Sequence, residues 1–289
     1  MASTRWPSTG WWTAWSPRRR SARWRALRGT WPGDVVRRSP ANQPPTGFRR
    51  VAVVKIVVLT GAGISAESGV PTFRDADGLW EGHRVEDVAT PEAFLADPDT
   101  VQRFYDARRA ALAAVEPNPA HTALAELERL VGDDLTLVTQ NIDDLHERAG
   151  STRVVHMHGE LRSALCVRCG GRCAWDGPML DADPCRSCGK GELRPDVVWF
   201  GEVPHHMDAI IDALVGCDLF VSIGTSGAVY PAAGFVQQAR AFGARTLELN
   251  LVPSEGTAYF HEARHGRAGE LVPAWVAELA ELGDLGMAR

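Results

Sequence analysis

Four of the six cysteines in this 289-residue chain form two Cys-x-x-Cys pairs. Cys166 and Cys169 make the first pair, and Cys185 and Cys188 make the second after fifteen intervening residues. Two such turns can supply four thiolates in tetrahedral geometry around one Zn²⁺, which leaves no open position for catalysis. The spacing therefore predicts a structural zinc site in a small lobe. Paired thiols of this kind also indicate a reducing compartment, and we expect the protein in the cytoplasm.

Short apolar runs rich in β-branched residues alternate with helical stretches from residue 51 onward. This alternation predicts an α/β fold, a Rossmann-like parallel sheet with helices on both faces. The predicted strands are residues 51–60, 135–139, 154–157, 219–223 and 246–249, and the predicted helices are residues 119–130, 207–215, 231–242 and 273–282. We expect one catalytic domain over residues 51–285, with the zinc module inserted at about 160–197.

The first fifty residues differ in composition from the rest of the chain. They carry eleven arginines and one acidic residue, so their charge is +10, while the net charge of −5 leaves −15 for the remainder. A remainder this acidic argues against general nucleic-acid binding. The leader has the arginine content of an organelle transit peptide, but a disordered or artefactual leader fits its six tryptophans better. No run reaches the roughly 20 apolar residues of a membrane span, so we expect no membrane partner.

A glycine-rich turn, Gly61-Ala62-Gly63, follows the first predicted strand directly. Glycines in this position can let backbone N–H groups approach a pyrophosphate at the start of the next helix. By itself the turn fits an ordinary tight turn equally well, because its third glycine comes too late for the standard dinucleotide fingerprint. Polar blocks then follow the later predicted strands: Gln140-Asn141-Ile142-Asp143, His156-Met157-His158-Gly159, Gly224-Thr225-Ser226 and Asn250. Since parallel strands end at one edge of a sheet, these blocks should line one cleft.

Together with the four cysteines, these blocks resemble the sirtuin (Sir2-like) family of NAD-dependent protein deacylases, in family order. The resemblance implies that NAD is the co-substrate and that one zinc ion is structural. It assigns to NAD binding the residues Gly61, Ala62, Gly63, Phe73, Arg74, Trp80, Gln140, Asn141, Ile142, Asp143, Gly224, Thr225, Ser226, Asn250, Leu251 and Ala268. For Asn141 and Asp143, capping of the next helix is an alternative that is compatible with ligand binding.

The family's catalytic position falls on His158, and the resemblance places Asn141 at the same catalytic centre. An imidazole titrates near neutral pH, so it can accept a proton from a ribose hydroxyl. His156 is the competing histidine, but it does not match the catalytic position. The implied reaction gives free lysine, nicotinamide and O-acyl-ADP-ribose. A mono-ADP-ribosyltransferase that uses the same site and a zinc-ribbon binding module are the alternatives.

Tyr105 and Arg108 are three residues apart on a predicted helix and therefore share one face. A phenol and a guanidinium can together bind a carboxylate. The pair matches the motif of the desuccinylase/demalonylase (class III) branch of sirtuins, and the small Ala76 would leave room for a longer acyl chain. Without the resemblance, Arg108 would be interpreted as a solvated surface residue. We predict acyl-lysine proteins as substrates, carrying succinyl, malonyl and also acetyl groups.

Residues 198–202 resemble the family segment that pairs with the substrate peptide as an added strand and lines the lysine tunnel. Val198 and Phe200 are the predicted substrate contacts in it. An ordinary buried strand is the alternative, and both interpretations can hold together.

Overall fold

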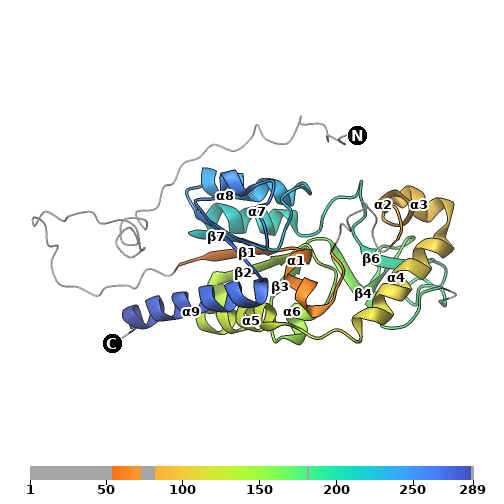
Figure 1. The fold of residues 1–289 in the computed structure, drawn as a ribbon. Coiled ribbons are helices and arrows are strands. Elements are labelled where there is room, and N and C mark those ends of the chain that lie inside the picture. Colours follow the sequence, from red (N-terminus) through yellow and green to blue (C-terminus); the bar gives the residue numbers. More distant parts are fainter. Residues whose placement is uncertain (1–53, 73–81, 181, 288–289) are drawn as a thin grey trace, which may run out of the picture. The chain divides into compact units, whose positions relative to one another are not determined.

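The computed structural model describes residues 54–72, 82–180 and 182–287, and Figure 1 traces their path. Six parallel strands form the main sheet in the order β3-β2-β1-β7-β8-β9. Their bounds are β1 Ile56–Thr60, β2 Leu135–Thr139, β3 Val154–His156, β7 Leu219–Ile223, β8 Arg245–Asn250 and β9 Glu262–His265. The chain first builds outward from β1 to β3 and then returns to the other side of β1. The direction of strand order thus reverses between β1 and β7, where parallel sheets bind ligands.

Helices cover both faces of this sheet, as the sequence predicted (Figure 1). On one face, Ile56 and Val58 of β1 pack against α5 (Pro119–Val131) and α9 (Ala268–Met287). On the other, Val57 and Leu59 pack against α7 (Met207–Gly216) and α8 (Phe235–Ala241). Burial on both faces explains why β1 is a continuous apolar run rather than an alternating one.

Two of the four predicted helices begin at residues other than those predicted. The helix predicted at residues 231–242 begins as the 3-10 turn η5 (Ala232–Gly234) before α8. The last helix begins at Ala268 instead of 273, because the Glu67 side chain accepts a hydrogen bond from the Gly269 N–H group (2.9 Å) and so stabilises an extra first turn. The other short elements are α1 Ala62–Ser65, η3 Ala66–Ser68, η4 Gly132–Asp134, α6 Leu145–Arg148 and η6 Thr257–Tyr259.

A second sheet, which the sequence analysis did not predict, holds Cys166 at the end of one strand, and its loops hold Cys169, Cys185 and Cys188. It has three antiparallel strands in the order β5-β4-β6, with bounds β4 Gly159–Cys166, β5 Arg172–Ala174 and β6 Leu193–Val197. Its buried hydrophobic cluster is small and includes two of the cysteines: Ala164, Cys166, Met179, Cys185 and Leu193. We call this sheet and its connecting loops the zinc lobe. A core of this size needs a metal or another cross-link to be stable.

The interpretation of residues 198–202 as an ordinary buried strand was wrong, because β6 ends at Val197 and the chain then turns. The Glu202 carboxylate accepts a hydrogen bond from the Trp199 N–H group (2.8 Å), which closes that turn. Pairing with a substrate strand remains a prediction.

Three helices join the main sheet to the zinc lobe: α2 (Val85–Val88), α3 (Pro91–Ala96) and α4 (Pro98–Leu112). Phe94, Phe104 and Tyr105 from these helices form one buried cluster with Val197 and Trp199 of the lobe. Figure 1 shows α4 lying along β4 and β6. Among the described residues, no helix combines the length and apolar character needed to cross a membrane.

Candidate active site and metal centre

The carboxyl ends of β1, β2 and β3 meet in register at Thr60, Thr139 and His156. The Thr60 hydroxyl lies 2.9 Å from the Thr139 hydroxyl and 3.0 Å from the Nε2 atom of the buried His146. This buried polar layer ends the sheet. The predicted residues of the 140–143 block and His158 follow directly beyond it.

The glycine turn after β1 contacts the Gly224-Thr225-Ser226 block after β7. The N–H groups of Gly61 and Gly63 donate to the carbonyls of Ile223 (3.0 Å) and Gly224 (2.8 Å). A Cβ atom on Gly63 would lie 2.7 Å from the Gly224 Cα atom, so only glycine allows this approach. The approach of the turn's other N–H groups to a pyrophosphate stays a prediction, while the N–H groups of Gly61 and Gly63 themselves bond backbone acceptors. They hold the turns after β1 and β7 together at the switch point.

Ser65, at the end of α1, joins Asn141 to Asp143. The Asn141 amide donates to Ser65 Oγ (3.1 Å), and the Ser65 hydroxyl donates to Asp143 Oδ2 (3.0 Å). The other Asp143 oxygen accepts from the N–H group of Leu145 (3.2 Å), the first residue of α6. The N-cap of α6 is Asp144, which makes no side-chain capping bond, so the alternative that Asn141 and Asp143 merely cap this helix was wrong. Burial raises the pKa of Asp143, although these two donors oppose the shift. Ile142, between them, packs its side chain toward the α4 cluster.

His121 on α5 completes this network, and sequence reasoning missed it. The Asn118 N–H group donates to His121 Nδ1 (3.3 Å), so the ring proton is on Nε2, which faces Ser65 Oγ at 3.4 Å. Burial lowers the pKa of His121 to about 4, so the ring is neutral at pH 7. Asn118 before Pro119 is a signal for the start of a helix, but no local pattern reveals a contact with a residue 56 positions earlier.

His158 has the environment of a general base. Its Nδ1 atom lies 3.0 Å from the Gln140 carbonyl, so Nδ1 carries the proton and Nε2 is left as the acceptor. Burial lowers the pKa of His158, the Gln140 carbonyl opposes this shift, and the neighbouring His205 adds to it. The imidazole is therefore neutral at pH 7. The Val198 N–H group donates to the His158 carbonyl (2.8 Å), which brings the predicted substrate segment beside the base.

His156 lacks that environment. Its Nε2 atom lies 2.8 Å from a Glu147 carboxylate oxygen, and its Nδ1 atom lies 3.3 Å from the Asn141 carbonyl. Burial alone would lower the pKa of His156, but Glu147 outweighs it and the pKa is raised. Both ring nitrogens of His156 face acceptors in the protein, so neither is left to accept a proton from a ribose hydroxyl. The role of His158 as general base stays a prediction.

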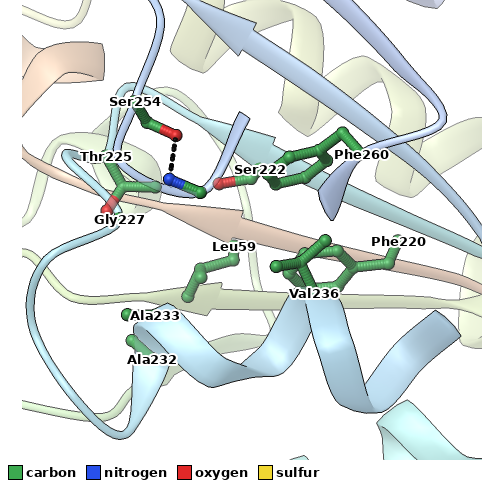
Figure 2. A pocket seen from close by; sticks show the side chains of 11 residues that line it. Leu59, Phe220, Ser222, Thr225, Gly227, Ala232, Ala233, Val236, Ser254 and Phe260 are labelled. Atoms are coloured by element: carbon green, nitrogen blue, oxygen red, sulfur yellow. Dashed lines mark hydrogen bonds between the residues drawn. The ribbon is translucent and has the colours of Figure 1, made fainter. Parts of the chain in front are cut away.

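Two further residues that were predicted to bind NAD, Gln140 and Asn250, lie around Thr225. The Gln140 amide donates to Thr225 Oγ1 (3.1 Å) and the Asn250 amide donates to the Thr225 carbonyl (2.9 Å). Figure 2 shows Thr225 at a hollow whose other walls include Leu59, Ser254 and Phe260. Ser226 and Leu251 are exposed beside this group. Ala268 begins α9, where the Glu67 contact places it near the segment that follows the first glycine turn.

Four of the predicted residues, Phe73, Arg74, Ala76 and Trp80, lie outside the described residues. Their roles toward NAD and the acyl group remain predictions.

Tyr105 and Arg108 lie on α4 as predicted. The Tyr105 side chain is fully buried, and its hydroxyl oxygen accepts from Trp199 Nε1 (3.0 Å). Burial raises the pKa of Tyr105, although the Arg108 charge nearby opposes this shift, so the phenol keeps its proton at working pH. Arg108 is half-buried, with its guanidinium carbon 5.6 Å from the centre of the Phe104 ring. Phe200 is 40% exposed after β6.

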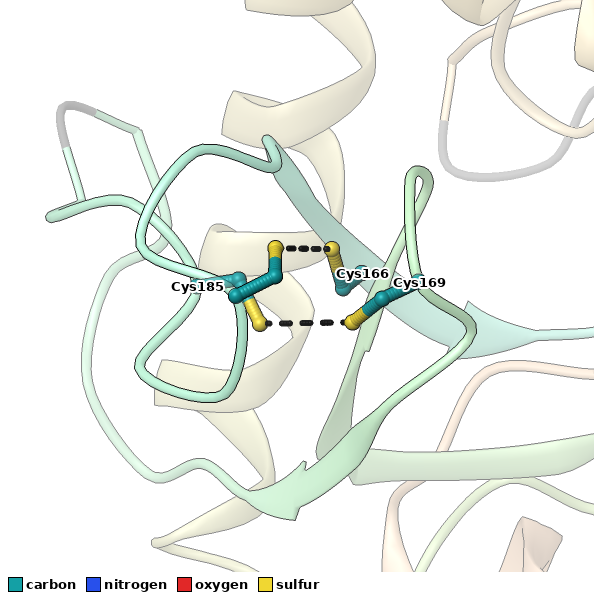
Figure 3. Close-up of side chains that lie close together, drawn as sticks. Cys166, Cys169 and Cys185 are labelled. Carbon is teal, nitrogen blue, oxygen red and sulfur yellow. Dashed lines mark hydrogen bonds between the residues drawn. The ribbon is translucent and has the colours of Figure 1, made fainter.

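The four cysteines of the two pairs converge in the zinc lobe (Figure 3). All their sulfurs lie within 4.8 Å of one another, with Cys166 to Cys188 at 3.9 Å and Cys169 to Cys185 at 3.8 Å. Zn–S bonds of about 2.3 Å in a tetrahedron place sulfurs about 3.8 Å apart, so the thiols fit one zinc ion. A Cβ atom on Gly191 would lie 2.1 Å from the Cys166 sulfur, so this site also requires a glycine.

These features define an α/β protein whose polar side chains gather at the carboxyl ends of a parallel sheet, where such folds bind ligands. The model of the Sir2 family matches residues 61–231. The chain belongs to the Sir2 family.

Relatives agree with this membership. The chain is 56% identical over 228 residues to an NAD-dependent protein deacylase of Pasteurella multocida, covering 78% of this chain and 97% of that protein. Among solved structures, a Sir2 homologue in complex with NAD superimposes with a TM-score of 0.72 at 40% identity, covering 79% of this chain and 90% of that one. A Sir2 protein bound to a myristoylated histone peptide gives 0.62 at 34% identity, covering 80% and 92%.

Proposed function

We propose that the protein is an NAD-dependent protein-lysine deacylase that removes succinyl and malonyl groups as well as acetyl groups. The single observation that carries the proposal is the neutral His158 beside Val198, with Nδ1 held by the Gln140 carbonyl and Nε2 left as a proton acceptor. Relatives at 56% identity that bear the name of NAD-dependent protein deacylase support the same activity. Acyl-lysine proteins are the proposed substrates and the cytoplasm is the proposed location. We keep residues 51–285 as the proposed catalytic domain.

The proposed division of labour follows the geometry of the cleft. NAD supplies the ADP-ribosyl group that receives the acyl chain when nicotinamide leaves, and water releases the lysine. The predicted residues around Thr225 hold the adenosine half, and Asn141 and Asp143, fixed by Ser65, hold the nicotinamide end. His158 Nε2 accepts the proton of a ribose hydroxyl, which makes that oxygen a nucleophile toward the acyl carbon. The four cysteines would bind a zinc ion that stabilises the zinc lobe and takes no part in the reaction.

The acyl preference is proposed from Tyr105 and Arg108. A neutral phenol and a guanidinium on one helix face can both donate to a terminal carboxylate, and a partly buried charge pair is screened less than an exposed one. An acetyl group carries no such carboxylate. The pair should therefore strengthen binding of succinyl-lysine and malonyl-lysine and leave acetyl-lysine unaffected.

The test is a comparison of matched succinyl and acetyl peptides by mass spectrometry, with the full chain and NAD. We expect free lysine and O-acyl-ADP-ribose from both peptides. Arg108→Met should lower kcat/KM for the succinyl peptide about 10- to 100-fold, the loss expected for a charge-assisted hydrogen bond, and leave the acetyl peptide nearly unchanged. Arg103→Met is the matched control, because Arg103 is on the same helix but exposed and paired with Asp99.

Three outcomes would count against the proposal. Removal of neither acyl group would overturn the deacylase activity. Equal losses for both peptides in Arg108→Met would overturn the carboxylate pocket alone. Transfer of ADP-ribose to the peptide without acyl removal would favour the mono-ADP-ribosyltransferase.

A further inference from the structure

A second face of α4, next to the one that carries Tyr105 and Arg108, is bonded to the zinc lobe. Gln102, Asp106 and Arg109 lie three or four residues apart and so share this face. We call these three side chains the lobe clasp. All of their bonds described below reach the lobe or each other.

The Asp106 carboxylate is the centre of the clasp. It accepts hydrogen bonds from the backbone N–H groups of Met179 (2.8 Å) and Leu180 (3.0 Å) in the loop after β5. Arg109 Nη1 donates to the same carboxylate at 2.7 Å. One partly buried carboxylate thus joins α4 to a loop more than seventy positions later in the chain.

Arg109 and Gln102 connect α4 to two strands of the lobe, the central strand β4 and the edge strand β6. Arg109 Nε donates to the Leu161 carbonyl of β4 (2.8 Å), and Nη1 also reaches the Gly177 carbonyl (3.2 Å). The Gln102 amide donates to the Leu193 carbonyl of β6 (2.7 Å). The side chains of Arg109 and Asp106 are only 2% and 13% exposed, so water screens their charges little.

The clasp links two parts of the molecule that have different tasks. On the lobe side, Met179 and Leu193 belong to the buried cluster that contains Cys166 and Cys185. On the pocket side, Tyr105 immediately precedes Asp106, and its hydroxyl is bonded to Trp199 just after β6. The Trp199 ring is in turn covered by Arg194 of β6 at 3.9 Å. The lobe therefore holds the acyl-pocket helix from both faces.

We propose that the lobe clasp sets the position of Tyr105 and Arg108, so that Asp106 and Arg109 are positioning residues for selectivity toward carboxylate-bearing acyl groups. This inference rests on the proposed function. A carboxylate that is bound by a phenol and a guanidinium needs both donors within hydrogen-bond distance. Whether both donors reach it depends on the position of α4 relative to the zinc lobe. An acetyl group makes no such demand. Loosening α4 should thus harm recognition of succinyl-lysine far more than the chemistry at His158.

The experiment measures kcat and KM of Asp106→Ala, in the full chain, with matched succinyl and acetyl peptides, together with zinc per chain. We expect KM for the succinyl peptide to rise about tenfold while kcat and both acetyl constants change less than about threefold, with zinc unchanged. Asp99→Ala is the matched control, because Asp99 is an exposed residue on the same helix that pairs only with Arg103 in the described contacts. Asp106→Asn keeps one acceptor oxygen and should show a smaller shift of the same sign, which covers the case in which the alanine variant fails to fold.

Arg108→Met is measured in the same series to separate the two proposals. If Arg108→Met is selective for the succinyl peptide but both Asp106 variants affect the two peptides equally, or not at all, the positioning role is overturned and the carboxylate pocket survives. If Arg108→Met is not selective either, the pocket itself is overturned, and the positioning role with it.

Discussion

The zinc lobe and the cleft at the strand ends both gather polar side chains at one point, but they do so by different means. The lobe draws its four thiols from a segment of twenty-three residues and has a buried cluster of only five. The cleft draws its residues from positions as far apart as Ser65 and Asn250, and two large hydrophobic clusters fix the strands that carry them. This difference indicates that the zinc lobe depends on its metal for stability, whereas the side chains of the cleft are held in position by the packed main sheet. Changes at the four lobe cysteines should therefore cost folding, whereas a change at His158 in the cleft should cost chemistry.

The largest effect is expected for Cys166→Ser. Structural zinc sites contribute on the order of 10 kcal/mol to the folding of small domains, so loss of one thiolate should leave the lobe unfolded. We expect loss of bound zinc, a lower Tm and poor solubility, measured by metal analysis and calorimetry. Cys173→Ser is the control, since Cys173 is exposed and outside the four-thiol cluster. A well-folded, zinc-loaded Cys166→Ser protein without activity would contradict the scaffold role.

The next effect is a pH dependence that arises from His121. Its folded-state pKa of about 4 lies below the ordinary value of 6.5, because burial disfavours the charged ring. Below pH 6.5 the imidazole of His121 is protonated in the unfolded chain but stays neutral in the folded protein. The free energy of unfolding is therefore highest above pH 6.5 and falls as the pH is lowered toward 4. The loss amounts to roughly 3 kcal/mol for a shift of this size.

His121→Gln removes this titration. Urea unfolding between pH 4 and pH 7 should give a variant that is less stable at neutral pH but whose free energy of unfolding falls less steeply on acidification. The difference between the two curves is the measured quantity, because zinc release at low pH affects both proteins alike. Parallel curves would show that His121 does not resist protonation.

A smaller effect is expected for Ser65→Ala. The change leaves the Asn141 amide and one Asp143 oxygen without their shared partner, which costs about 1–3 kcal/mol in a buried site. We expect a moderate loss of stability and a higher KM for NAD, while zinc content stays the same. Ser68→Ala is the matched control three residues later, because the Asn118 amide that bonds Ser68 also has the Ile64 carbonyl. Equal effects of the two variants on stability and on KM for NAD would contradict a role of Ser65 in positioning Asn141 and Asp143.

The same contrast explains what the sequence could predict. The strands at residues 135–139 and 219–223 were predicted with the bounds that the structure has, because nearly all of their residues are buried and most are apolar or β-branched. The convergence of the polar blocks was predicted because parallel strands end at one edge. The four-thiol cluster was predicted from spacing alone, and the Sir2 family was confirmed.

What the sequence could not predict depends on contacts between distant segments. The strand β5 is exposed and three residues long, so it carries no buried apolar run to mark it. The amides of Gly61 and Gly63 bond carbonyls that arrive from β7, which no local pattern reveals. His121 and the lobe clasp are likewise defined by partners more than fifty positions away. The individual NAD and acyl contacts remain predictions.

The most direct test of the division between scaffold and chemistry is His158→Ala, assayed at once for zinc per chain, Tm and formation of O-acyl-ADP-ribose. Removal of a general base lowers rates by about 10²- to 10⁴-fold. We predict a loss of that size in product formation, with stoichiometric zinc and an unchanged Tm, since the half-buried ring is seated by one hydrogen bond to the Gln140 carbonyl. Product formation near the wild-type rate, or a loss that follows zinc release and unfolding, would contradict the account.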